Sequence, residues 1–350
     1  MKKIYQLAYL TFLLAPTVVF AGNEDRIGQA GAQELLINPW GRTAGWGNSG
    51  TSTVRGVEGL FSNVAGTVFT RRTELCMSRT MWLQGTGINI SSFGLSTTIG
   101  KKDSIGKSVI SVGVTSVNYG DILVTTSELP EGGQGTLSPR HTNIAFGYAR
   151  RFSPTITAGM TVRMLTQSVS NVSTSGVAMD AGILYVTENN KYRFGVTLKN
   201  VGPRLRYKGD GLSFKAFNQN GTYKYTVENR SEDFDLPTVL NIGAAYKADL
   251  AKEHALTFAF NFQANAFGKD QITGGLEYAF KDVLMLRAGY DYEKGITNMV
   301  TRTTALTGLS AGASFLVPLS KSGLNLGIDY GYRATNPFSG CHTLGLRLNL

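Results

Sequence analysis

Apolar and polar residues alternate strictly through most of the chain after residue 70. The pattern is clearest in residues 341–350, where Leu344, Leu346, Leu348 and Leu350 alternate with small or polar side chains. Because successive side chains of a strand point to opposite faces, this stretch predicts a strand with one face of leucines. Its length suits a tilted strand that crosses a bilayer, although an edge strand of a soluble sandwich would alternate in the same way.

Fourteen such runs follow one another along the chain. They cover residues 73–83, 86–99, 106–118, 140–151, 154–169, 175–187, 191–200, 237–248, 253–264, 271–281, 283–293, 306–318, 322–333 and 341–350. An even number of strands is typical of single-chain bacterial barrels.

The connections between these runs alternate in length. The long ones are residues 119–139, 201–236, 294–305 and 334–340, and the tight ones between them are 101–105, 152–153, 188–190, 249–252, 282 and 319–321. Short periplasmic turns and longer outer loops are typical of outer-membrane barrels, and this phase predicts that both termini are periplasmic. A sandwich gives no reason for the alternation. We therefore predict an all-β fold, a 14-stranded antiparallel transmembrane β-barrel over residues 71–350.

The first seventy residues do not alternate. Residues 1–21 have the pattern of a cleaved signal peptide, with Lys2 and Lys3 before an apolar stretch and small residues at Val19 and Ala21. Residues 22–70 are rich in Gly turns, and we expect one or two short helices that form a hatch or plug in the lumen. A free periplasmic tail is the alternative.

Composition agrees with a barrel. The chain has 42 Gly in 350 residues, above the usual share of about 7%, and Gly disfavours long helices. A charged fraction of 17% and a mean hydropathy of −0.06 are too polar for a helical membrane bundle. The net charge is +10, or +8 without Lys2 and Lys3, which favours anionic headgroups or an acidic protein over nucleic acid as partner. Cys76 and Cys341 are predicted near opposite rims and hence free.

No pattern of catalytic or cofactor-binding residues is convincing. Residues 45–50 match G-x-G-x-x-G, but no strand precedes them and no helix with a later acidic residue follows. Residues 100–108 resemble a phosphate loop with the wrong spacing and are better interpreted as a charged hairpin. His141, His254 and His342 fall at separate strand ends, away from any nucleophile and acid. We expect no enzyme activity, no cofactor and no metal.

Charged residues occupy the polar faces of the predicted strands and would point into the lumen. They are Arg163, Arg193, Lys199, Glu277, Arg287, Asp291, Glu293, Asp329, Arg333 and Arg347. We expect them to pair with one another and with the hatch, so that the interior is filled. A selective polar channel is the alternative and would need an open lumen.

Several segments, in order, resemble the PorV/PorQ family of outer-membrane proteins. The opening Glu34–Gly47, with Gly45 and Gly47, is similar to that family's Gly/Ala-rich turn, and Leu60–Gly66 resembles its W-N-P-A-G element. In that element Asn63, Ala65 and Gly66 match, and Val64 replaces the proline. The similarity continues through Met77–Leu83, Phe194–Tyr207, Leu236–Tyr246 and Gly274–Tyr290.

The resemblance implies a FadL-like barrel with an N-terminal hatch and a role in the type IX secretion system. Such proteins associate with the translocon barrel, receive cargo by its C-terminal signal domain and carry it to the surface attachment complex. Outer-membrane lipid and lipopolysaccharide would surround the barrel. A FadL-like transporter of a hydrophobic small molecule is the alternative, and it requires an apolar pocket below the outer loops and a kinked strand near the hatch.

The loop 201–236 mixes aromatic and basic residues, a composition that favours a protein interface. Its candidate cargo or partner residues are Arg204, Arg206, Tyr207, Phe214, Phe217, Tyr223 and Tyr225. A solvated loop or one that faces lipopolysaccharide is the alternative.

Overall fold

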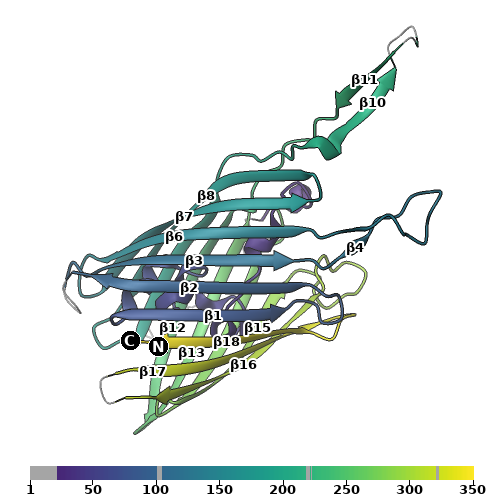
Figure 1. Cartoon of the computed structure of the whole chain (residues 1–350). Helices are drawn as coiled ribbons and strands as arrows, with labels where there is room; N and C mark the ends of the chain where they lie inside the picture. Colours follow the sequence, from purple (N-terminus) through teal and green to yellow (C-terminus); the bar gives the residue numbers. More distant parts are fainter. Residues whose placement is uncertain (1–21, 101–104, 218–220, 222, 321–322) are drawn as a thin grey trace, which may run out of the picture.

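The computed structural model describes residues 22–100, 105–217, 221, 223–320 and 323–350. Fourteen strands form a closed barrel in which every neighbour is antiparallel and the first strand pairs with the last (Figure 1). The strands are β1 (Thr73–Met81), β2 (Asn89–Ile99), β3 (Ser108–Asn118), β6 (Arg140–Arg151), β7 (Ile156–Val169), β8 (Val172–Val186), β9 (Tyr192–Val201), β12 (Val239–Ala251), β13 (His254–Asn265), β14 (Gln271–Phe280), β15 (Leu284–Glu293), β16 (Leu306–Pro318), β17 (Asn325–Thr335) and β18 (Cys341–Asn349). The predicted 14-stranded antiparallel barrel is confirmed. The predicted signal peptide lies outside the described residues.

The barrel turns its apolar faces outward. In β18 the side chains of Leu344 and Leu346 are 53% and 52% exposed, whereas Thr343 and Arg347 on the other face are buried. The same alternation recurs around the barrel, so its outer surface is a continuous belt of aliphatic and aromatic side chains. A belt of this kind is typical of a barrel surrounded by lipid. Among the described residues no helix is both long and apolar enough to cross a membrane.

Two long loops contain small sheets that the sequence did not predict. β4 (Ile122–Leu123) pairs with β5 (Thr136–Leu137), and β10 (Ser213–Phe217) pairs with β11 (Lys224–Glu228) after the single turn η6 (Asp210–Leu212). The β10–β11 hairpin projects well away from the barrel (Figure 1). We call the end of the barrel that carries these loops the long-loop rim, and the opposite end, with connections 152–155, 252–253 and 281–283, the short-turn rim.

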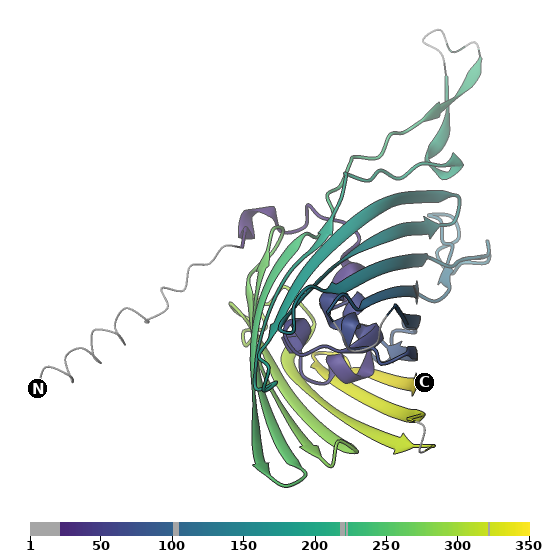
Figure 2. The same cartoon turned by 90° about the vertical axis from the view of Figure 1, so that its left-hand side faces the viewer.

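The hatch lies inside the barrel (Figure 2). It consists of six short turns rather than the one or two helices expected: η1 (Glu24–Arg26), η2 (Gln33–Leu36), α2 (Gly41–Ala44), η3 (Ser49–Thr51), η4 (Gly56–Leu60) and η5 (Val64–Phe69). Five of the six are 3-10 turns. Short 3-10 turns are common where a chain connects or ends helices, and the frequent Gly residues here prevent longer helices.

The hatch crosses the lumen from one rim to the other. At the long-loop rim the Gly22 amide donates to the Asp270 carboxylate at 2.8 Å, and Ala30 forms a bridge with Asp235. At the short-turn rim the Leu350 amide donates to the Thr73 carbonyl at 2.8 Å, where the hatch has just joined β1. The expectation that both termini share the periplasmic rim is therefore wrong for the described residues. The even number of strands brings the chain back to the same rim, but the hatch adds one more crossing.

Candidate functional site: a filled lumen and a projecting hairpin

A ring of glycines on the inner wall lets the hatch approach the barrel closely. A Cβ atom placed on any of them would lie within 3.0 Å of a hatch atom. They are Gly94, Gly113, Gly147, Gly182, Gly195, Gly243, Gly275, Gly289, Gly312 and Gly331, each on a different strand. Real Cβ contacts are longer than this, so the wall has no room for side chains at these places. This contact accounts for ten of the 42 Gly residues of the chain.

The predicted turn residues Gly45 and Gly47 are part of the same contact. A Cβ on Gly45 would lie 2.7 Å from the Gly312 Cα atom, so two backbones touch there. Gly47 has a φ of +68°, in the left-handed region that glycine tolerates best. The next amide, of Asn48, donates to the Asp291 carboxylate at 3.1 Å. These glycines hold the hatch against the wall, and no ligand-binding loop is formed.

Asn63 connects three parts of the interior. Its Oδ1 accepts from the Ala65 amide at 3.1 Å and caps η5, as Asn does at helix N-termini. Its Nδ2 donates to the Thr51 carbonyl at 2.8 Å and to a β8 carbonyl at 3.1 Å. Ala65 is fully buried, and a Cβ on Gly66 would lie 2.5 Å from the Val54 carbonyl oxygen. The matched N-x-A-G residues therefore hold η5 in place against η3 and against β8 of the wall.

Most of the predicted lumen charges have partners within the wall. Three ion pairs join side chains of the wall: Arg163–Asp180 and Arg287–Glu277 at 2.7 Å each, and Arg347–Asp329 at 3.4 Å. Near the long-loop rim, Glu293 accepts from Gln271 at 3.0 Å and from Thr303 at 2.9 Å. Paired charges can be buried, whereas an isolated one is strongly disfavoured.

Other lumen charges contact the hatch directly. Arg333 donates to the Asn38 carbonyl at 2.9 Å, Arg163 donates to the Leu60 carbonyl, and Lys199 lies 3.8 Å above the centre of the Phe61 ring. Arg193 is the exception, since it has neither an ion pair nor a hydrogen bond to the described residues, and its Nε is buried without a partner. With Val57 and Val68 fully buried among these contacts, the lumen is filled by hatch and side chains.

The cysteines and histidines form no reactive site. Cys76 and Cys341 are both free, as expected from their register, in which Cys76 lies opposite Arg347 and Cys341 opposite Arg333. The three histidines each share a hydrogen bond with a tyrosine hydroxyl: His141 with Tyr119, His254 with Tyr278 and His342 with Tyr330. Within the described part of the chain, no group of three or more possible metal ligands occurs.

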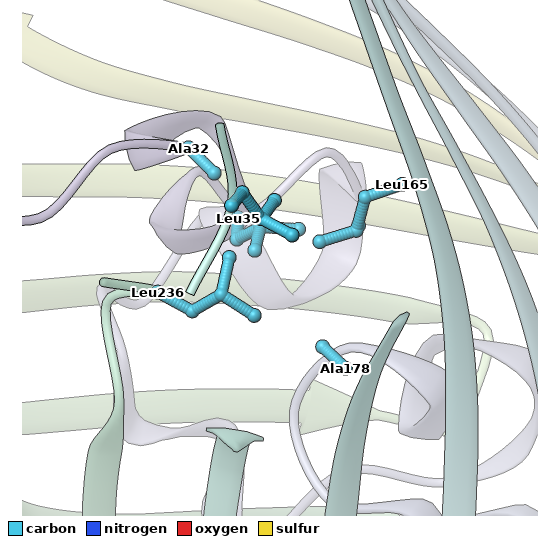
Figure 3. Close-up of a cluster of buried hydrophobic side chains, with 6 residues drawn as sticks. Ala32, Leu35, Leu165, Ala178 and Leu236 are labelled. Carbon is cyan, nitrogen blue, oxygen red and sulfur yellow. The ribbon is translucent and has the colours of Figure 1, made fainter. Parts of the chain in front are cut away.

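The root of the projecting hairpin is well packed. Leu205 and Leu236, on its two arms, join Leu35 of the hatch and Leu165 and Ala178 of the wall in a buried cluster (Figure 3). This cluster ties loop, hatch and barrel together at the long-loop rim. Sequence patterns could not reveal it, because its members come from separate segments.

Three of the predicted loop residues belong to this root. Arg206 makes two hydrogen bonds to Asp233 at 2.6 and 3.0 Å, and Arg204 pairs with Asp235 at 3.0 Å. The Tyr207 hydroxyl donates to Gln167 at 2.6 Å, and burial raises the pKa of that hydroxyl. The hydrogen bond and charge of Arg206 lower the pKa of Asp233. These contacts stabilise the loop, while the side chains of Arg204 and Arg206 remain exposed, so their role in binding a partner stays a prediction.

The other four predicted loop residues lie on or beside the hairpin and are exposed. Phe214, Phe217, Tyr223 and Tyr225 are 46%, 59%, 64% and 46% exposed. Residues directly opposite each other in a ladder share a face. Phe214 lies opposite Val227 and Ala216 opposite Tyr225, so one face is apolar. The other face carries Lys215, Phe217 and Lys224, with Lys224 Nζ 4.9 Å above the Phe217 ring.

A cavity of about 440 Å³ lies at the long-loop rim, between the start of the hatch and strands β12–β15. Its lining mixes apolar side chains such as Ile27, Leu36 and Phe267 with polar ones such as Gln271 and Glu293. Below it the hatch packs against the wall.

The pairing of β8 with β9 is irregular. The register shifts between Met179 and Ala181, where the Asp180 carboxylate accepts a hydrogen bond from the Asn200 amide at 2.8 Å and so occupies the bulge.

The geometry defines the class of protein: a 14-stranded membrane barrel of the FadL-like fold, plugged by its N-terminal segment. The solved structures that it resembles include the Pseudomonas putida toluene transporter TodX, with a TM-score of 0.53, and the Ralstonia pickettii toluene transporter TbuX and a Pseudomonas aeruginosa FadL homologue, each with 0.52. All three are 12% identical, the matches cover 88–89% of this chain, and they cover 97–98% of those chains. At this identity the likeness establishes the fold alone.

The family model of the type IX secretion system membrane protein PorP/SprF matches residues 91–336. This is well over half of the chain, which therefore belongs to the PorP/SprF family of outer-membrane proteins. No curated protein matches the sequence significantly. The resemblance to a type IX secretion protein with a FadL-like barrel is confirmed at that level, and the PorV/PorQ branch stays a prediction.

Proposed function

We propose that this protein is a non-enzymatic outer-membrane adaptor of type IX secretion, which binds secreted cargo through its C-terminal signal domain at the translocon barrel. In this proposal it then carries the cargo to the surface attachment complex, as PorV/PorQ-like proteins do. The long-loop rim faces the cell exterior, and lipid and lipopolysaccharide surround the apolar belt. The short turns face the periplasm.

The observation that carries the proposal is the two-faced hairpin β10–β11. Its apolar face, formed by Phe214, Ala216, Tyr225 and Val227, is exposed and stands on a rigid root. Exposed aromatic groups on a rigid support are typical of protein interfaces, and a hairpin edge can add to the sheet of a folded β-domain. The filled lumen favours an adaptor over a channel.

The two faces of the hairpin allow a matched test. The variant with Phe214→Ser and Tyr225→Ser removes the apolar face, and the variant with Lys215→Gln and Lys224→Gln alters the other. Each is purified from outer membranes in detergent, and co-purified cargo is quantified. We expect at least a tenfold loss of cargo with the first variant and less than a threefold loss with the second.

Full cargo recovery with the Phe214 and Tyr225 variant would contradict the proposal, provided that the barrel still shows its normal heat-modified mobility on a gel. Loss of cargo in the Lys215 and Lys224 variant alone would also contradict it, because the hairpin would then contribute charge and not its apolar face. Detection of the translocon barrel in the same pull-down tests the second partner separately.

A FadL-like transporter of a hydrophobic small molecule is the second candidate. The cavity of about 440 Å³ at the long-loop rim supports it, because such transporters need an entry pocket below the outer loops. The resemblance to toluene transporters adds the fold but not the activity. Uptake of a labelled hydrocarbon that disappears on Phe267→Arg, with cargo co-purification unchanged, would favour this candidate.

A further inference from the structure

A cationic cavity lies between the hatch and the wall near the short-turn rim. Its volume is about 160 Å³, and its lining contains six basic residues and two carboxylates, those of Glu277 and Asp282. The basic residues are Arg42, Arg55, Arg193, Lys247, Arg287 and Arg347. The lining therefore carries an excess of positive charge. Elsewhere on the inner wall, positive and negative side chains occur mainly in pairs.

Three of these six cations have carboxylate partners. Arg42 pairs with Glu58 at 3.3 Å, and the ion pairs of Arg287 and Arg347 within the wall are given above. None of the other three forms an ion pair with a described residue. Two carboxylates lie near them: Glu277, which already pairs with Arg287, and Asp282, which lies exposed in the turn between β14 and β15.

Arg193 is the most unusual of the three. Its side chain is 9% exposed, its Nε has no partner, and it lines the cavity from β9. Burying a guanidinium without an acceptor is unfavourable unless a ligand supplies one. Arg55 reaches the same cavity from the hatch and donates to the Asn190 amide oxygen at 2.9 Å, so its charge is not neutralised.

The cavity is accessible from the short-turn rim. A second cavity of about 400 Å³, lined by Glu253, His254 and Lys281 at the rim, shares Lys247 and Asp282 with the first. Lys247 is half-buried where the two meet. A ligand from the aqueous side could therefore pass Lys247 and reach Arg193.

We propose that this cavity binds an oxyanion, a carboxylate or phosphate group, held by Arg193, Lys247 and Arg55. The planar guanidinium of Arg193 suits two parallel hydrogen bonds to such a group, and Lys247 adds a point charge at the entrance. A volume of about 160 Å³ fits a single group of this size. The group can come from a free anion or from an acidic side chain of a protein segment. The site does not depend on the role of the hairpin.

The test uses the full-length protein in a neutral detergent, with thermal unfolding followed at constant ionic strength in sodium chloride, inorganic phosphate or a hexaglutamate peptide. A ligand that binds only the folded state raises its melting temperature. We expect phosphate or the peptide to raise the melting temperature of the wild type. We expect Arg193→Met to weaken that response at least tenfold, and Lys247→Gln to weaken it severalfold.

Arg150→Gln is the matched control, because Arg150 lies near the same rim on the outer face of β6. It should respond as the wild type does. Without ligand, Arg193→Met should melt at the same temperature as the wild type or higher, since it removes an uncompensated buried charge.

The outcomes separate the two sources. A response to phosphate supports a free anion as ligand, and a response to the peptide alone supports a protein carboxylate. The proposal would be overturned if neither ligand raised the melting temperature of the wild type, or if Arg193→Met and Lys247→Gln both responded as strongly as the wild type. Loss of cargo binding in the hairpin variants would leave it unaffected.

Discussion

Single glycines decide how closely the hatch can approach the wall. A Cβ on Gly289 would lie 2.4 Å from the Trp46 carbonyl carbon, which belongs to backbone and cannot rotate away. Gly274, on a neighbouring strand, has no atom within 4 Å of the same position. Gly289 faces the hatch, whereas Gly274 faces outward, because the next residue, Gly275, is one of the inner-wall glycines.

We expect Gly289→Ala to destabilise the barrel by about 1–3 kcal/mol, the usual cost of overpacking. Gly274→Ala should change stability little and serves as the control. Denaturant unfolding of both variants in detergent gives the comparison. Equal stability of the two would show that the hatch adjusts to the added methyl group.

Residue patterns predicted these close contacts only in part. The high Gly count and the N-x-A-G match indicated tight turns in the hatch, but not that Gly312 would touch Gly45 across the lumen. Alternation placed Arg163 and Arg287 inside, whereas their acceptors depend on strand register, which no single strand reveals. Arg193 looked equivalent to both in the sequence, and only its surroundings distinguish it.

Among the elements, the β10–β11 hairpin has a root that combines backbone hydrogen bonds with exposed ion pairs. Leu205 and Phe234 exchange two backbone hydrogen bonds of 2.9 Å at its root, beside the Arg206–Asp233 pair. Because the pKa of Asp233 is lowered in the folded loop, this pair stabilises the root above the unfolded pKa of about 4. The contribution is lost as the pH falls through the lower folded value.

We therefore expect the amides of Leu205 and Phe234 to lose protection from hydrogen exchange below about pH 4. Asp233→Asn should show weaker protection at pH 7 and a smaller change on acidification, so the difference between the two proteins isolates Asp233. Parallel curves for wild type and variant would contradict a role of this pair.

The barrel strands were predictable because lipid on one side and the hatch on the other enforce alternation. The hairpin was not, because β10 and β11 face water on both sides and have only five residues each. The hatch turns were underestimated for a related reason. They are held by contacts with the wall, and short segments such as Ser49–Thr51 carry no periodic signal of their own.

At the scale of the whole molecule, the crossing of the hatch separates the two ends of the described chain. Gly22 is bound at the long-loop rim and Leu350 at the short-turn rim. An epitope tag directly before Gly22 and one after Leu350 should therefore be accessible from opposite sides of the membrane. Antibody labelling of intact and permeabilised cells tests this, and a periplasmic location of both tags would contradict it.

The passage of the hatch through the interior also constrains how the protein is assembled. Once β18 has paired with β1, a filled cylinder leaves no space through which a segment with Trp40 and Trp46 could be drawn. The N-terminal segment must therefore occupy its place while the cylinder is still open.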